Sequence, residues 1–121
     1  MLSRRRILIA EDHPIVAYGI ARAVEDAGGE VVGPVASVEE GLSLLQRAKV
    51  DAAILDVGLA DRDVAPIAES LLKRGVVVVF HTAAAVPAAI VERHGPVVVC
   101  PKPMDPDRVV QKLATLINRG A

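Results

Sequence analysis

The chain has 121 residues, of which 52% are hydrophobic and 24% charged, so it carries enough apolar material for the core of one compact domain. Its formal net charge of -1 gives no net attraction to nucleic acid or to an anionic membrane. We therefore expect residues 1–121 to form a single globular domain whose partners include neither.

Apolar segments rich in β-branched residues alternate along the chain with segments of helical period. We predict strands over residues 7–10, 31–35, 52–55, 76–80 and 97–100. We predict helices over residues 14–27, 65–72, 87–93 and 106–117, with a further helix that starts after Ser37. Glu40, three residues after Ser37, supports that helix start, and Asp105 is the expected cap of the last helix. The alternation predicts an α/β fold of βαβ units, with a parallel sheet covered by helices on both faces.

Polar residues follow four of the predicted strands at the point where each strand ends. Glu11 and Asp12 follow the first strand, Asp56 the third, Thr82 the fourth and Lys102 the fifth. Binding sites of open parallel sheets form outside the carboxyl ends of the strands. Each residue alone has a simpler explanation as a cap, a turn residue or a surface charge, but those roles do not require this combination.

The clustered residues predict phosphoryl chemistry. Three neighbouring carboxylates repel one another unless a cation lies between them, and oxygen ligands of this kind suit Mg²⁺. Such a metal can bind a phosphoryl oxygen while Lys102 and the Thr82 hydroxyl contact the others. Asp56 is the expected nucleophile because it comes from the central strand of the predicted sheet.

With these residues in this order, the sequence resembles the receiver domain of two-component response regulators of the stand-alone type. The matching motifs are Glu11-Asp12 after the first strand, Asp56 in Ile54-Leu55-Asp56-Val57, Thr82-Ala83, and Lys102-Pro103. The resemblance covers nearly the whole chain. It implies a flavodoxin-like (βα)5 doubly wound parallel sheet with strand order 2-1-3-4-5.

The resemblance also implies a function. A sensor histidine kinase or phosphotransfer protein would pass a phosphoryl group to Asp56, with Mg²⁺ held by Glu11, Asp12, Asp56 and the main-chain carbonyl of Gly58. The peptide bond between Lys102 and Pro103 would be cis. We expect no enzymatic activity beyond self-phosphotransfer and autodephosphorylation. Because no effector domain follows the last predicted helix, we expect output through an unknown downstream protein or through a phosphorelay.

Three positions depart from the family pattern. Val99 stands where receivers commonly have an aromatic ring that rotates as Thr82 moves, so the usual aromatic relay is absent or rewired. Pro101 removes a backbone donor at the end of the fifth strand. His81 replaces the alanine of the Phe-Ala-Thr segment found in a subgroup of stand-alone receivers.

Three alternative functions compete with this interpretation, and the sequence argues against the first two. A nucleotide- or flavin-binding domain would use the same fold class, but no phosphate-binding glycine pattern follows the first strand. A phosphoester hydrolase with Asp56 as nucleophile would need a second carboxylate two residues later, where Gly58 stands. A degenerate receiver that acts as a phosphorylation-independent interaction module is made credible by Val99 and Pro101.

The remaining polar and reactive residues have simpler explanations. His13 is expected at a helix start, His81 packed at a strand end, and His94 at a helix C-terminus, where the dipole favours it. Cys100 is expected to be a small core residue. Residues 7–10 are too short an apolar run for a signal peptide, and no segment is long enough to span a membrane, so we expect a cytoplasmic protein.

Overall fold

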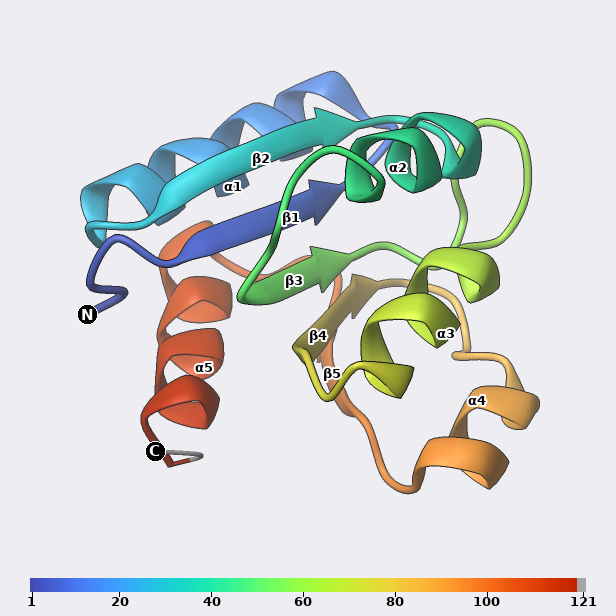
Figure 1. Ribbon diagram of the computed structural model, residues 1–121. Coiled ribbons are helices and arrows are strands. Elements are labelled where there is room, and N and C mark those ends of the chain that lie inside the picture. Colours follow the sequence, from blue (N-terminus) through green and yellow to red (C-terminus); the bar gives the residue numbers. More distant parts are fainter. Residues whose placement is uncertain (120–121) are drawn as a thin grey trace.

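The computed structural model describes residues 1–119, in which five strands alternate with five helices (Figure 1). All neighbouring strands are parallel, in the order β2-β1-β3-β4-β5, which confirms the predicted fold. The strands are β1 (Arg6–Ala10), β2 (Glu30–Val35), β3 (Ala52–Leu55), β4 (Val77–Thr82) and β5 (Val98–Pro101). The helices are α1 (Pro14–Asp26), α2 (Val38–Leu45), α3 (Ala65–Lys73), α4 (Ala88–His94) and α5 (Pro106–Arg119).

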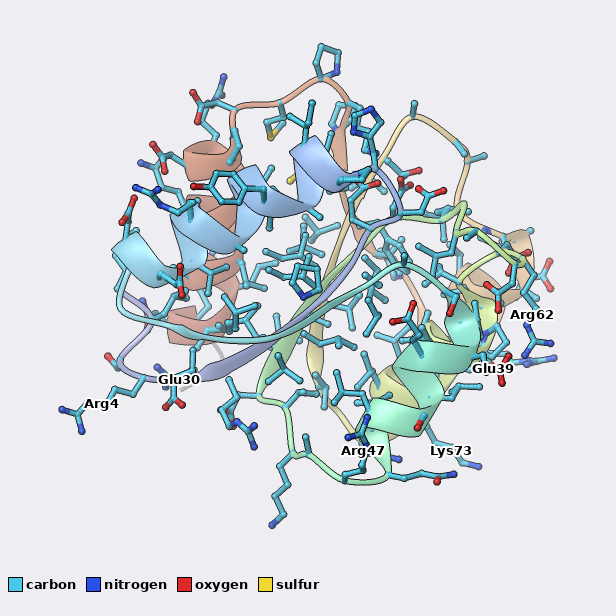
Figure 2. The ribbon with its side chains drawn as sticks, turned by 90° about the horizontal axis from the view of Figure 1, so that it is seen from above. Arg4, Glu30, Glu39, Arg47, Arg62 and Lys73 are labelled. Carbon is cyan, nitrogen blue, oxygen red and sulfur yellow. The ribbon has the colours of Figure 1, made fainter. Side chains whose placement is uncertain are left out.

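Alternate side chains of the strands enter two separate apolar layers. In β1, Leu8 packs with residues of α2, α3 and α4 on one face of the sheet, whereas Ile7 and Ile9 pack with residues of α1 and α5 on the other. Charged side chains project from the outside of this three-layer arrangement, among them the six labelled in Figure 2. Among residues 1–119, no helix has both the length and the apolar character needed to cross a membrane.

The element boundaries differ from the predicted ones most clearly at β4. This strand continues to Thr82 rather than ending at Phe80, because His81 and Thr82 still pair with Cys100 and Pro101 of β5. Thr82 is therefore the last residue of β4 and does not lie in the following loop. The predicted cap at Ser37 is confirmed by a 3.1 Å bond from the Glu40 amide to the Ser37 hydroxyl oxygen.

The end of β1 is fixed by an irregular pairing with β2. The register of the two strands shifts between Leu8 and Ala10, opposite Gly33. Gly33 has φ +99°, and a Cβ atom there would lie 2.9 Å from the Val35 nitrogen, so glycine suits this close approach. The shift brings the Val35 carbonyl to 2.9 Å from the amide of Glu11, which anchors the first acidic residue after β1.

Candidate functional site

The polar residues predicted from the sequence meet at the carboxyl edge of the sheet. Glu11 and Asp12 leave β1, Asp56 leaves β3, Thr82 ends β4 and Lys102 leaves β5. β3 pairs with both β1 and β4, and β4 pairs with β5, so Asp56 lies between the acidic pair and the residues of the last two strands.

Three carboxylates form the acidic side of this edge. Glu11 and Asp56 are buried, whereas Asp12 is exposed, and one oxygen of each lies within 4.8 Å of the others. Carboxylate oxygens are hard ligands, and Mg²⁺ usually takes only a few of them and completes its shell with water. The donor set therefore fits a hard divalent cation.

Lys102 lies between two of these carboxylates. Its Nζ is 2.7 Å from Glu11 Oε1 and 2.7 Å from Asp56 Oδ2. The backbone at Lys102 is fixed by a 3.1 Å bond from its amide to the Thr82 carbonyl, and the peptide bond to Pro103 is cis, as the resemblance implied. The strand end thus delivers the ammonium directly to the acidic cluster.

Burial and the neighbouring charges shift the pKa values of Asp56, Glu11 and Lys102, and not all in the same direction. Burial acts to raise the pKa of Asp56, but the Lys102 ammonium and the Thr82 hydroxyl outweigh it and hold that pKa below its ordinary value. Burial raises the pKa of Glu11 even against the neighbouring Lys102. Burial acts to lower the pKa of Lys102, but bonding to Asp56 and Glu11 raises it overall. Asp56 is therefore the carboxylate that this environment favours in its ionised, nucleophilic form.

Thr82 and Gly58, which come from β4 and from the loop after β3, have different surroundings. Thr82 is buried, and its Oγ1 accepts a 3.1 Å bond from the amide of Ala84. Gly58 is exposed in the loop after β3, where a bridge joins it to Asp63. The hydroxyl is held close to the phosphoacceptor candidate, and the glycine backbone is open to solvent.

The residues that depart from the family pattern are also placed by the structure. Val99 is exposed on β5, and Cys100 is buried as predicted. His81 is buried as predicted, but its Nε2 has no hydrogen-bond partner among the described residues. Burial, and then the charge of Lys102, lower the pKa of His81. His13 is the N-cap residue of α1, and its amide donates to Glu11 Oε2 at 3.0 Å.

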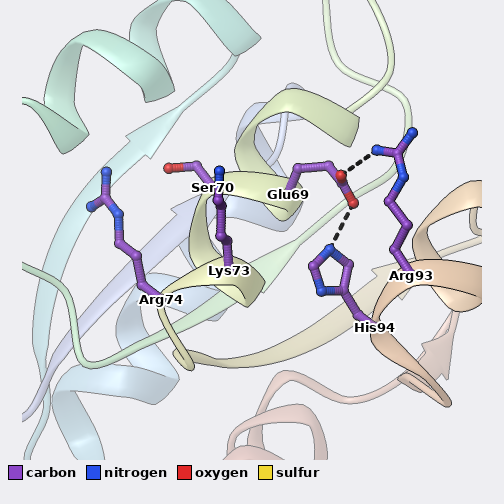
Figure 3. A pocket seen from close by; sticks show the side chains of 6 residues that line it. All are labelled: Glu69, Ser70, Lys73, Arg74, Arg93 and His94. Atoms are coloured by element: carbon purple, nitrogen blue, oxygen red, sulfur yellow. Dashed lines mark hydrogen bonds and ion pairs between the residues drawn. The ribbon is translucent and has the colours of Figure 1, made fainter.

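A second charged cluster lies between α3 and α4 and was missed in the sequence (Figure 3). Glu69 accepts from Arg93 Nη1 at 2.6 Å and lies 2.9 Å from Nε2 of His94. These residues line a hollow together with Ser70, Lys73 and Arg74. Arg93 and His94 lie 24 and 25 residues after Glu69 in the sequence, so no local pattern predicts that they pair with it.

Comparisons with known proteins identify the family to which these residues and this fold point. The profile of the response regulator receiver domain family matches residues 7–114. The transcriptional regulatory protein PdtaR of Mycobacterium tuberculosis is 36% identical over 59 residues, which are 49% of this chain and 29% of PdtaR. The match therefore spans less than one third of that relative's length.

Solved structures show the same fold over almost the whole chain. A CheY-like response regulator receiver domain protein from Methanospirillum hungatei JF-1 superposes with a TM-score of 0.83 at 23% identity, covering 97% of this chain and 96% of that chain. The response regulator PhyR from Brucella abortus gives a TM-score of 0.74 at 30% identity, covering 98% of this chain and 52% of that chain.

Proposed function

Because this chain belongs to the response regulator receiver domain family, we propose that Asp56 accepts a phosphoryl group from a phosphohistidine of a sensor histidine kinase or phosphotransfer protein. A carboxylate oxygen of Asp56 forms the new P–O bond while the P–N bond breaks, and the donor imidazole leaves with the electron pair. The observation that carries this proposal is the surroundings of Asp56, a buried carboxylate that Lys102 keeps ionised at 2.7 Å.

We propose Mg²⁺ as the cofactor, with Glu11, Asp12, Asp56 and the main-chain carbonyl of Gly58 as the residues that would hold it. Three carboxylates face one ammonium at this edge, which leaves an excess of negative charge for a hard cation to neutralise. A bound Mg²⁺ would also accept an oxygen of the incoming phosphoryl group.

The side chains of Lys102 and Thr82 would then move to contact the phosphoryl oxygens. Once an oxygen of Asp56 is bonded to phosphorus as an acyl phosphate, the carboxylate loses its charge, and the Lys102 ammonium is drawn to the phosphoryl oxygens instead. The buried Thr82 hydroxyl, whose oxygen accepts from the Ala84 amide, can donate its proton to another of them. Both movements would carry the change at Asp56 into β4 and β5.

Output would follow from this change of shape, with no separate substrate turned over. We propose that the phosphorylated chain, acting in the cytoplasm, either binds a downstream protein or passes the phosphoryl group on. A degenerate receiver that binds its partner without phosphorylation is the competing function, favoured by the exposed Val99 in place of an aromatic ring.

Incubation with acetyl phosphate and Mg²⁺, followed by intact mass, separates the two functions. The wild type should gain one phosphoryl group that is labile to acid and base, and Asp56→Asn should gain none. Asp51→Asn is the matched control, because Asp51 lies before β3, at the opposite edge of the sheet. An unmodified wild type would favour the degenerate receiver, and equal labelling of Asp56→Asn would place the acceptor elsewhere.

A further inference from the structure

The loop of residues 56–64, between β3 and α3, turns back on itself beside the acidic cluster. Gly58 and Asp63 face each other across it in an antiparallel bridge. Ala60 and Asp61 therefore lie at its tip. Gly58 lies two and three residues from that tip, and its carbonyl belongs to the same peptide unit as the Leu59 amide, which donates to the Arg62 carbonyl at 3.2 Å.

The tip is bonded to the start of α2. Asp61 Oδ1 accepts from the amide of Val38 at 2.8 Å, and Asp61 Oδ2 accepts from the amide of Glu39 at 3.2 Å. The Ala60 amide donates to the Ala36 carbonyl at 3.0 Å. One carboxylate thus supplies two of these three bonds and also places a negative charge at a helix N-terminus, where the dipole favours it.

The inner side of the loop is held by apolar packing. The side chains of Val57, Leu59 and Val64 are buried in the apolar layer beneath it. Gly58 and Asp61 are both exposed, so packing does not fix the outer side of the loop. Two backbone bonds close the loop on itself, from the amide of Leu59 to the Arg62 carbonyl at 3.2 Å and from the amide of Val64 to the Val57 carbonyl at 2.8 Å. The Asp61 carboxylate and the Ala60 amide then join this closed loop to the start of α2.

We propose that Asp61 is a positioning residue, which holds the Gly58 carbonyl in reach of the metal by fastening the loop to α2. This inference rests on the proposed metal-dependent function of Asp56. Residues that orient a ligand without touching the metal typically change metal affinity about tenfold or more when they are replaced. Because α2 is the other end of the connection, its first turn is coupled to the occupancy of the metal site.

Ser37 provides a matched control within the same helix start. Its hydroxyl oxygen caps the amide of Glu40 at 3.1 Å, so Ser37→Ala also removes an acceptor from the first turn of α2. Ser37 makes no side-chain bond to residues 56–64. A loss of metal affinity that comes only from a frayed α2 would therefore affect Ser37→Ala and Asp61→Ala alike.

Charge needs a separate control, because Asp61→Ala also removes a negative charge near a cation site. Asp63→Asn removes one charge from the same loop, and the Asp63 side chain caps the amide of Ala65 at 2.8 Å rather than α2. Asp61→Asn removes the charge but keeps one oxygen acceptor for the amide of Val38.

The test is a Mg²⁺ titration followed by the backbone amide shifts of Asp12 and Gly58. We expect Asp61→Ala to raise the apparent Kd for Mg²⁺ about tenfold, with Ser37→Ala and Asp63→Asn close to the wild type. We expect Asp61→Asn to lie between the wild type and Asp61→Ala. Asp12→Asn, which removes a ligand, sets the scale for a damaged site.

Three results would count against the inference, and they differ from one another. A wild type without saturable shifts would overturn the proposed metal site itself. Equal Mg²⁺ affinity in the wild type and Asp61→Ala would overturn only the role of Asp61. Equal weakening in Asp61→Ala, Asp61→Asn and Asp63→Asn would replace positioning with a long-range effect of charge.

Discussion

Two charged clusters in this protein have similar bond lengths and opposite charge patterns. At the carboxyl edge of the sheet, one ammonium lies 2.7 Å from two carboxylates, those of Glu11 and Asp56. Between α3 and α4, one carboxylate, Glu69, lies 2.6 and 2.9 Å from two basic side chains. The distances alone do not distinguish a functional cluster from a surface ion pair.

Burial and charge balance do distinguish them. In the edge cluster Glu11 and Asp56 are 4% and 12% exposed and Lys102 is 22% exposed. In the α3–α4 cluster Arg93, Glu69 and His94 are 66%, 28% and 21% exposed. Water therefore screens the Arg93–Glu69 pair more than the two buried carboxylates of the edge cluster, whose charges interact more strongly. The edge cluster also has an excess of carboxylates, and the α3–α4 cluster has none. A buried, unbalanced cluster is the one suited to bind a cation and a phosphoryl group.

The largest effect should come from removing the central cation of the buried cluster. Lys102→Met leaves Glu11 and Asp56 close together without a counter-charge, and we expect it to lower the free energy of unfolding by about 2 kcal/mol at neutral pH. This value is below that of a fully buried pair because Lys102 is partly exposed. Urea unfolding measures it, with Lys49→Met, on the exposed surface, as the control.

Repeating the urea unfolding with Mg²⁺ tests whether a metal can replace the missing ammonium. If the acidic cluster accepts a metal, saturating Mg²⁺ should restore part of the stability lost in Lys102→Met, because the divalent cation replaces the missing positive charge. A variant as stable as the wild type in the absence of metal would show that the two clusters do not differ in strength.

The next effect concerns how the two clusters act on α4. Residues 83–85 are exposed directly after Thr82, whereas the far end of α4 is bonded to Glu69 through Arg93 and His94. We propose that a phosphoryl group draws Thr82 inwards and orders residues 83–96. Hydrogen exchange with and without beryllofluoride should show the largest gain in protection near Ala83 and a smaller one towards His94.

Thr82→Val tests whether the hydroxyl carries that change. The substitution keeps the shape of the side chain and removes the oxygen that accepts from Ala84, so most of the gain in protection should be lost. A response confined to residues 58–75 in the wild type would mean that the signal leaves by another face.

The sequence predicts the edge cluster well because each of its residues stands where an apolar run stops. In a parallel sheet those points meet at one edge, so order along the chain is sufficient to bring Glu11, Asp56 and Lys102 together. The end of β4 was wrong by two residues, since His81 and Thr82 do not look apolar but still pair with β5. Local pattern does not report such pairing.

Contacts between loops and helices far apart in the sequence could not be predicted in the same way. The bond from Val38 to Asp61 joins residues 23 positions apart, and that from Arg93 to Glu69 joins residues 24 apart. The first depends on how the loop of residues 56–64 lies against α2, and the second on how α3 and α4 lie side by side. An exposed acidic residue in a loop or on a helix carries no sign of which distant amide or guanidinium it will meet.

The smallest effect should come from the exposed cluster. Arg93 first, and then His94, hold the pKa of Glu69 below its ordinary value of 4.5, against the opposing effect of burial. Glu69 therefore stays ionised to lower pH in the folded chain than in the unfolded chain. Its stabilising contribution is full above the ordinary pKa and is lost as the pH falls through the folded pKa.

We expect Glu69→Gln to lower the stability slightly at neutral pH and low salt, and to make the loss of stability below pH 4.5 shallower than in the wild type. High salt should reduce the difference, because exposed charges are screened. Thermal unfolding at several pH values measures both, with Glu92→Gln as the control, since Glu92 forms no ion pair within residues 1–119. A loss of stability as large as that of Lys102→Met, and unchanged by salt, would contradict this expectation. It would show that Glu69 is as strongly coupled to its partners as the buried carboxylates are to Lys102. The two clusters would then differ only in charge balance.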